Sequence, residues 1–139
     1  MSVEENKAIA CRFLEGQDLH KGPPPAELCA PNYTANIVGF PSMDLAGHAE
    51  LARAFYGAFP DLKHIIEDAV GEGDKAAIRF RLRGTQRGEF MGFAPTNKEV
   101  EIAGVAIFRM VGGKASELWE TFDQLGLMQQ LGMIPPPGE

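Results

Sequence analysis

The sequence is poor in the residues that build metal sites and disulfide frameworks. Its 139 residues include two cysteines, Cys11 and Cys29, and three histidines, without a CxxC, HExxH or His-x-His spacing. Two isolated thiols do not make a structural zinc site without other ligands. There is also no P-loop or dinucleotide-binding fingerprint. We therefore expect no metal and no cofactor.

Long apolar runs and an excess of positive charge are also absent. No stretch approaches the roughly 20 apolar residues of a membrane span, and residues 1–7 are polar and acidic rather than signal-like. The formal net charge of −6 opposes binding to phosphate backbones. These features predict a cytoplasmic protein that binds neither membranes nor nucleic acid.

What is present is the composition and patterning of a globular protein, 45% hydrophobic and 23% charged. The length fits a single domain over residues 1–139. Apolar residues at helical spacing predict helices over Val3–Leu14, where Gly16 follows as a stop, and over Gly47–Phe59. A helical turn at Ala26–Cys29 and a last helix at Leu125–Leu131 are also expected.

Strands are predicted over five segments, of which only the first precedes the helix at Gly47–Phe59. They are Tyr33–Val38, Leu62–Val70, Ala76–Thr85, Val100–Val111 and Ala115–Asp123. Helices followed by a run of hairpins favour the α+β class over a parallel α/β sheet. We expect a curved antiparallel sheet and a few helices closed around a small apolar pocket.

Pairing the last two predicted strands suggests where a site lies. If Gly112-Gly113 is a two-residue turn, Val111 faces Lys114, and the same register pairs Ala106 with Trp119 and Ile102 with Asp123. One face then carries the small residues Gly104 and Ala106 beside the only tryptophan and a carboxylate. A gap, a large ring and a polar group together indicate a binding site.

Asp123 has two interpretations on this register. Enclosed in the pocket, it would have a raised pKa and suit a general acid or base. At a strand end, it would cap the helix that begins near Gln124. The spacing does not separate these roles, and both are compatible with one residue.

Other polar residues are weaker candidates. The alternation of the strand at 76–85 places Gln86 on its apolar side, where an amide can bind a carbonyl, although a turn position is the simpler reading. Asn36, His48 and His64 are each expected to be structural or at the surface. The aromatic loop residues Phe90, Met91 and Phe93 are interpreted as core packing or a lid.

Four segments in order resemble the SnoaL-like polyketide cyclase family, which belongs to the nuclear-transport-factor-like superfamily. They are Ala58-Phe59-Pro60-Asp61-Leu62, Gly84 to Phe90, Gly113 to Asp123, and Leu125 to Gly132. The resemblance implies a cone-shaped α+β barrel whose N-terminal helices and curved sheet enclose a deep pocket. It further implies ring closure of an aromatic polyketide ester by intramolecular aldol condensation without metal or cofactor, and a homodimer formed through the outer face of the sheet.

Residue by residue, the resemblance assigns the acid/base role to Asp123 and a pocket position to Asn36. Gln86 stands where family members commonly carry histidine, and glutamine cannot titrate. In the mechanism we expect, Gln86 and Asn36 bind the developing oxyanions, and an apolar or aromatic ligand lies against Trp119, Phe90, Tyr33 and Phe40. The alternatives are a non-catalytic binding protein for an apolar small molecule, favoured by the missing histidine, and an isomerase or hydrolase on the same fold.

Overall fold

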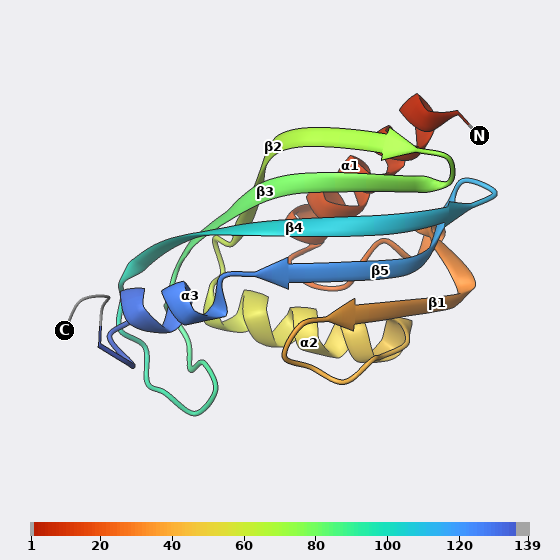
Figure 1. Cartoon of the computed structure of the whole chain (residues 1–139). Helices are drawn as coiled ribbons and strands as arrows, with labels where there is room; N and C mark the ends of the chain where they lie inside the picture. Colours follow the sequence, from red (N-terminus) through yellow and green to blue (C-terminus); the bar gives the residue numbers. More distant parts are fainter. Residues whose placement is uncertain (1, 136–139) are drawn as a thin grey trace.

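The computed structural model describes residues 2–135 and contains one five-stranded sheet with the strand order β1-β5-β4-β3-β2 (Figure 1). The elements along the chain are α1 (Val3–His20), the 3-10 helix η1 (Ala26–Leu28), β1 (Cys29–Ile37), α2 (Leu45–Ala58), β2 (Lys63–Glu72), β3 (Lys75–Thr85), β4 (Glu99–Val111), β5 (Lys114–Phe122) and α3 (Gln124–Gln130). The predicted α+β architecture is confirmed. Residues 1 and 136–139 of the predicted domain lie outside the described residues.

Helix α1 begins where the sequence predicts and ends later. Ser2 and Glu5 form a capping box, in which each side chain accepts a hydrogen bond from the other's backbone N–H. The helix runs through Gly16 instead of ending there. At this glycine a side chain would collide with Pro25, so its small size serves close packing rather than termination. The helix ends at Lys21, whose left-handed φ of 52° closes the last turn.

The sheet is antiparallel except for one edge strand, β1. β2, β3, β4 and β5 pair as antiparallel neighbours, whereas β1 lies parallel to β5 at the edge. The sheet is therefore mostly antiparallel, as expected, with β1 as a parallel edge strand. This strand precedes helix α2 and has no hairpin partner, so no tight turn fixes its direction.

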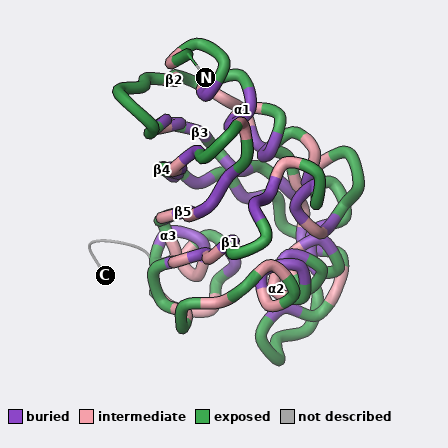
Figure 2. The backbone as a smooth tube through the Cα atoms, turned by 90° about the vertical axis from the view of Figure 1, so that its right-hand side faces the viewer, coloured by how far each residue is buried: buried purple, intermediate pink, exposed green. Residues whose placement is uncertain are grey.

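One face of the sheet is covered by helices and the other is not. Helix α1 packs on β2 and β3, and α2 lies beside β1. Buried residues gather on the covered side, as the tube view shows (Figure 2). Along β3 and β4 the burial alternates strictly, with Ile78, Phe80 and Leu82 inside and Arg79 and Arg81 outside. The predicted solvated arginine face is confirmed, since both arginines pair with Glu67 on β2.

A β-bulge in β5 changes the register that the turn predicts. Val111 pairs with Lys114 as expected, and Met110 pairs with Ala115, but Arg109 then pairs with Glu117. Ser116 is the extra residue, and every later pair is displaced by one position. The predicted pairs Ala106–Trp119 and Ile102–Asp123 are therefore wrong. Ala106 is paired with Glu120 instead, and Ile107 with Trp119.

The empty volume expected in front of Gly104 is not there. A Cβ on Gly104 would lie 2.6 Å from the ring of Phe80, so that ring already occupies the space. Deeper in the core, Phe13 packs edge-on against Phe108 with 4.9 Å between ring centroids. The pocket must therefore lie elsewhere on the inner face. Within the described residues, no helix is long and apolar enough to cross a membrane.

Candidate functional site

A largely apolar pocket lies between α2, the ends of β1, β2 and β5, and the last turns of α1. Its volume is about 50 Å³, which is small for a ligand site, and the pocket opens to solvent. The apolar walls are formed by Ile37, Leu51, Phe55, Leu62, Leu82 and Phe122. Five polar side chains also reach this space: Gln17, His48, Tyr56, His64 and Glu120.

Glu120 is the carboxyl group of this pocket. The bulge at Ser116 puts Leu118, Glu120 and Phe122 on the inner face of β5, so Glu120 is only 9% exposed. Burial raises the pKa of this carboxyl, because the charged form loses its hydration, and nearby His64 opposes the shift. Its oxygens have no hydrogen-bond partner among the residues that the structure describes. The environment thus favours a protonated carboxyl that is free to donate to a ligand.

His64 lies close to Glu120 and is fixed by Asp18 of α1. Its Nδ1 is 2.8 Å from Asp18 Oδ1, and its backbone N–H donates to Asp18 Oδ2 at 2.8 Å. The hydroxyl of Tyr56 donates to the same Oδ1 at 2.6 Å. Burial, and then the bond to Asp18, raises the pKa of Tyr56, so the phenol stays a donor. One carboxylate therefore ties α1 and α2 to the first residues of β2.

His48 forms a second pair with Tyr33, one of the residues predicted from sequence. The hydroxyl of Tyr33 and Nδ1 of His48 are 2.8 Å apart, and the two rings are stacked. Burial lowers the pKa of His48 to about 4, with a smaller contribution from His64, while burial raises that of Tyr33. Both groups are therefore neutral near pH 7. A phenol that donates to Nδ1 leaves the other ring nitrogen, Nε2, as an N–H donor.

Of the aromatic residues predicted from sequence, Tyr33, Phe40 and Phe90 lie near the pocket. Phe40 and Phe90 line two small cavities of about 190 and 120 Å³ that share the Phe55 side chain with the main pocket. The ring of Phe90 also packs 5.3 Å from that of Phe55. Together with Tyr33 behind His48, these residues extend an apolar surface from the interior towards the loop at 87–98.

Three predicted ligand contacts lie away from this pocket. Gln86 is fully buried, but its Oε1 accepts from Thr96 and its Nε2 donates to carbonyls of the same loop, among them Gly88 and Ala94. Trp119 lies on the outer face, with the guanidinium of Arg109 5.7 Å from its ring centroid.

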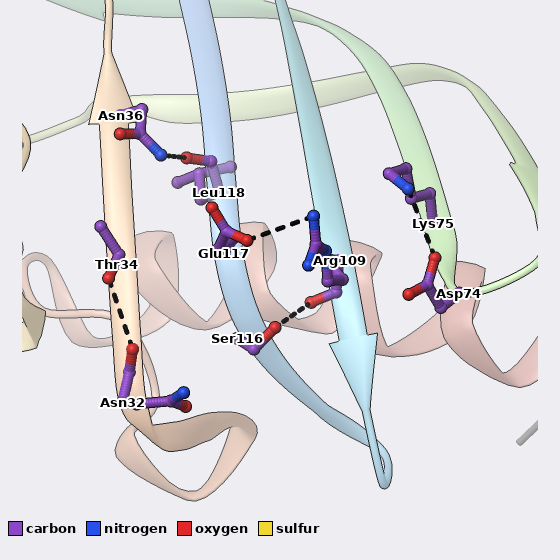
Figure 3. A network of polar contacts seen from close by, with 9 residues as sticks. All are labelled: Asn32, Thr34, Asn36, Asp74, Lys75, Arg109, Ser116, Glu117 and Leu118. Carbon is purple, nitrogen blue, oxygen red and sulfur yellow. Dashed lines mark hydrogen bonds and ion pairs between the residues drawn. The ribbon is translucent and has the colours of Figure 1, made fainter.

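Asn36 is also on the outer side, where it donates to the Leu118 carbonyl (Figure 3). Its side-chain oxygen accepts from the hydroxyl of Ser42. Contact of Gln86 or Asn36 with a ligand would require these bonds to break.

Asp123 has the capping geometry that was one of its two interpretations. It is exposed at the end of β5, and its Oδ1 accepts from the backbone N–H of Gly126 at 2.8 Å in the first turn of α3. The expected enclosure beside Trp119 and Ile102 is wrong, because the bulge turns that position away from the inner face.

Sequence reasoning missed Glu120 and Asp18 and placed His48 and His64 at the surface. The structure buries both histidines, which are 3% and 7% exposed. One signal was available: Glu120 alternates with Leu118 and Phe122, so the apolar parity of β5 already groups it with inward residues. Asp18 gave no such signal, because it contacts His64 across 46 positions of the chain.

No metal site accompanies these groups in the described part of the chain, where no three His, Cys, Asp or Glu side chains lie close enough to hold an ion. The fold defines an α+β protein of the nuclear-transport-factor-like class, with a small pocket of apolar and polar side chains on the inner side of its sheet. The sequence pattern of the SnoaL-like polyketide cyclase family matches residues 9–131, and the chain belongs to this family.

Solved structures support the same assignment. AclR from Streptomyces galilaeus, a candidate hydroxylase, superposes with a TM-score of 0.86 at 27% identity, over 99% of this chain and 87% of its own. IdmH from Streptomyces antibioticus, a candidate polyketide cyclase, superposes with a TM-score of 0.76 at 27% identity, over 93% and 99% of the two chains. A SnoaL-like protein from Jannaschia sp. CCS1 shares the fold with a TM-score of 0.81 at 21% identity, over 96% and 95% of the two chains. No curated protein sequence matches the chain.

Proposed function

We propose that the protein is a cofactor-independent cyclase-type enzyme that closes a ring in an apolar carbonyl compound by intramolecular aldol condensation. A base removes a proton from the carbon next to one carbonyl and leaves an enolate. The enolate carbon attacks a second carbonyl of the same molecule, and the new alkoxide takes up a proton. The product is a cyclic hydroxyketone with the same atoms as the substrate.

The observation that carries this proposal is the apolar pocket with an unpaired, buried carboxyl at Glu120. A carboxylic acid held in its protonated form is a hydrogen-bond donor, and it becomes stronger as negative charge develops on a carbonyl oxygen. The neutral ring of His48 supplies a second donor through Nε2. Two donors in a largely apolar site stabilise an enolate oxygen without a metal.

The apolar walls define the class of ligand. Phe55, Phe122 and Leu51 favour a flat or folded hydrocarbon skeleton, and the adjoining cavities at Phe40 and Phe90 accommodate a longer one. Holding two carbonyls of one flexible molecule close together lowers the entropic cost of ring closure.

The family resemblance assigns the proton transfer to Asp123, and this role remains open to test. The residue caps α3 at the exposed end of β5, so it meets a substrate only at the mouth. Glu120, three residues earlier, reaches the interior. Replacing each of these two residues separately therefore separates a reaction at the mouth from one in the pocket.

The test uses a flexible diketone with one aryl carbonyl and one methyl ketone, spaced for closure to a cyclohexanone ring. Closure removes the aryl-ketone absorbance at unchanged mass, which absorption and mass spectrometry both follow. We expect Glu120→Leu, which removes the donor, to lower the rate about 10²-fold or more, whereas Glu99→Gln, at an exposed carboxyl on β4, leaves it unchanged. Asp123→Asn with a similar loss would support the family-derived role.

The alternative of a non-catalytic binding protein gives a different result in the same experiment. The diketone would then bind, as measured by calorimetry, without absorbance change in the wild type. Closure at equal rates in wild type and Glu120→Leu would contradict the role that we give to this carboxyl. The missing family histidine at Gln86 does not by itself favour the carrier, because Gln86 holds the loop at 87–98 in place.

We also propose a homodimer through the outer face of the sheet. Val105 and Ile107 of β4 are each 37% exposed on this face, beside the ring of Trp119. The pairs Arg109–Glu117 and Arg79–Glu67 flank these apolar side chains. An apolar strip with charged margins fits a second copy of the same surface.

A further inference from the structure

The side chain of His64 separates two cavities. On the inner side it lines the pocket with Glu120, and on the outer side it lines a groove of about 640 Å³ with Asp18 and Lys63. Leu62 is the other residue common to both spaces. The imidazole therefore touches a largely apolar pocket and also a polar surface open to water.

The bonds around His64 determine which of its ring nitrogens is free. Asp18 is acceptor-only when ionised, and it already accepts from Tyr56 and from the backbone N–H of His64. Nδ1 of His64 must therefore carry the proton that is shared with Asp18 at 2.8 Å. Nε2 keeps its lone pair, and it has no hydrogen-bond partner within residues 2–135. A neutral imidazole with a free, oriented nitrogen is a general base.

The neighbours of His64 suit this role. The ring lies 5.0 Å from that of Phe80, which fixes its plane, and the carboxylate of Asp18 stabilises the imidazolium that forms when Nε2 takes up a proton. Glu120 lies near enough for the charge on His64 to affect its pKa. A carbonyl bound to Glu120 would therefore lie in the same pocket as His64.

We propose that His64 is the catalytic base of the pocket and that Asp18 is the positioning residue that holds it with Nε2 unprotonated. This inference rests on the proposed aldol chemistry. Nε2 of His64 takes the proton from the carbon next to the carbonyl, and the C–H electron pair becomes the enolate. After the new C–C bond forms, the same nitrogen returns the proton to the alkoxide. The outer groove lets the imidazolium exchange its proton with water before that return.

The first experiment isolates proton abstraction with β-tetralone, an apolar ketone that cannot cyclise. Proton NMR in D₂O measures entry of deuterium at the carbons next to the carbonyl. We expect wild-type protein to accelerate this exchange and His64→Gln to reduce the acceleration about 10²-fold or more. His20→Gln, an exposed histidine at the end of α1, is the matched control and should exchange at the wild-type rate. Wild-type exchange in His64→Gln would overturn the proposal.

The second experiment needs no substrate. With only three histidines in the chain, ¹⁵N-labelled imidazole spectra assign each ring, and the tautomer of His64 is read directly. We expect the Nδ1–H form in the wild type and a shift towards Nε2–H in Asp18→Asn, because the amide can donate to Nδ1. That variant should also lose about 10²–10⁴-fold in exchange rate, as misoriented His–Asp pairs do. A wild-type Nε2–H tautomer would overturn the assignment.

The two results separate the inference from the proposed function. If wild-type protein exchanges β-tetralone but does not close the diketone, the cyclase proposal fails while the base is supported. If the wild type does not exchange β-tetralone, enolisation in this pocket fails, and His64 as its base fails with it, whatever its tautomer. If exchange occurs and survives loss of His64, only the inference fails.

Discussion

At the scale of single residues, Glu120 is where stability and function conflict. An isolated carboxyl in an apolar pocket is unfavourable when charged, and this one is offered no hydrogen bond by any described residue. Groups of this kind are retained at sites where a ligand completes them. The free-energy cost of burying this carboxyl in its charged form therefore depends measurably on pH.

We predict that Glu120→Gln stabilises the fold at neutral pH by about 1–2 kcal/mol while lowering activity. The folded pKa of Glu120 lies above the ordinary value of 4.5, so its favourable contribution is present below that pH and is lost as pH rises through the folded pKa. The stability difference between variant and wild type should thus be small at pH 4 and grow towards pH 7. Urea unfolding at several pH values measures it.

The matched control for this prediction is Glu99→Gln on the exposed side of β4, which should show no such growth with pH. If the stability difference between Glu120→Gln and wild type is the same from pH 4 to pH 7, the carboxyl ionises in the folded protein as it does in the unfolded chain.

At the scale of elements, the bulge at Ser116 decides which residues face the pocket. Upstream of it, Ala115 and Lys114 follow the register set by the Gly112-Gly113 turn, and downstream of it Trp119 and Glu120 exchange faces. Because side chains alternate with a period of two, an extra residue without a bulge would turn the whole downstream segment to the opposite face. The inward position of Glu120 therefore depends on the bulge that absorbs Ser116.

Deleting Ser116 should remove the bulge and keep every later pair, because Glu117 would then follow Ala115 directly opposite Arg109. We expect a cooperatively folded variant, since the buried positions opposite Phe108 and Ala106 keep Leu118 and Glu120. Circular dichroism and thermal unfolding check this outcome. Ser116→Ala keeps the residue count and loses one long hydrogen bond of 3.4 Å to Arg109, so it should also fold normally. An unfolded deletion variant beside a folded Ser116→Ala would contradict this account.

At the scale of the whole molecule, the two faces of the sheet have separate uses. The inner face, under α1 and α2, carries the core and the pocket, while the outer face carries Trp119 with Val105 and Ile107 (Figures 1 and 2). Trp119 fluorescence consequently reports on the outer surface and not on ligand in the pocket. It is therefore a probe for self-association.

We predict that Val105→Asp converts the proposed homodimer into monomers, because a charge cannot be buried unpaired in such an interface. Sedimentation velocity measures the mass, and Trp119 emission should shift to longer wavelength on dissociation. Leu19→Asp, on α1 and therefore off this face, is the control and should leave the mass unchanged. A monomeric wild type at high protein concentration would refute the dimer.

The elements of the fold followed from local patterns. Three of these patterns each act over a few residues and can therefore be recognised in the sequence. They are the capping box at Ser2 and Glu5, the alternation of Ile78, Phe80 and Leu82, and the glycine turn at Gly112-Gly113. For the site, the predicted aromatic residues Tyr33, Phe40 and Phe90 do lie at or beside cavities.

The sequence by itself determined the α+β class, the order of the elements and the family, because these depend on periodicity, turn residues and short motifs. Only the tertiary structure decided which polar groups meet. Asp18, Tyr56 and His64 come from three different elements, and Glu120 faces the pocket beside His64 because a bulge absorbs Ser116. Contacts between distant segments depend on how the whole core packs, and no local pattern encodes them. For Glu120, the alternation with Leu118 and Phe122 was a local signal, but the bulge that makes it the correct one is seen only in the structure.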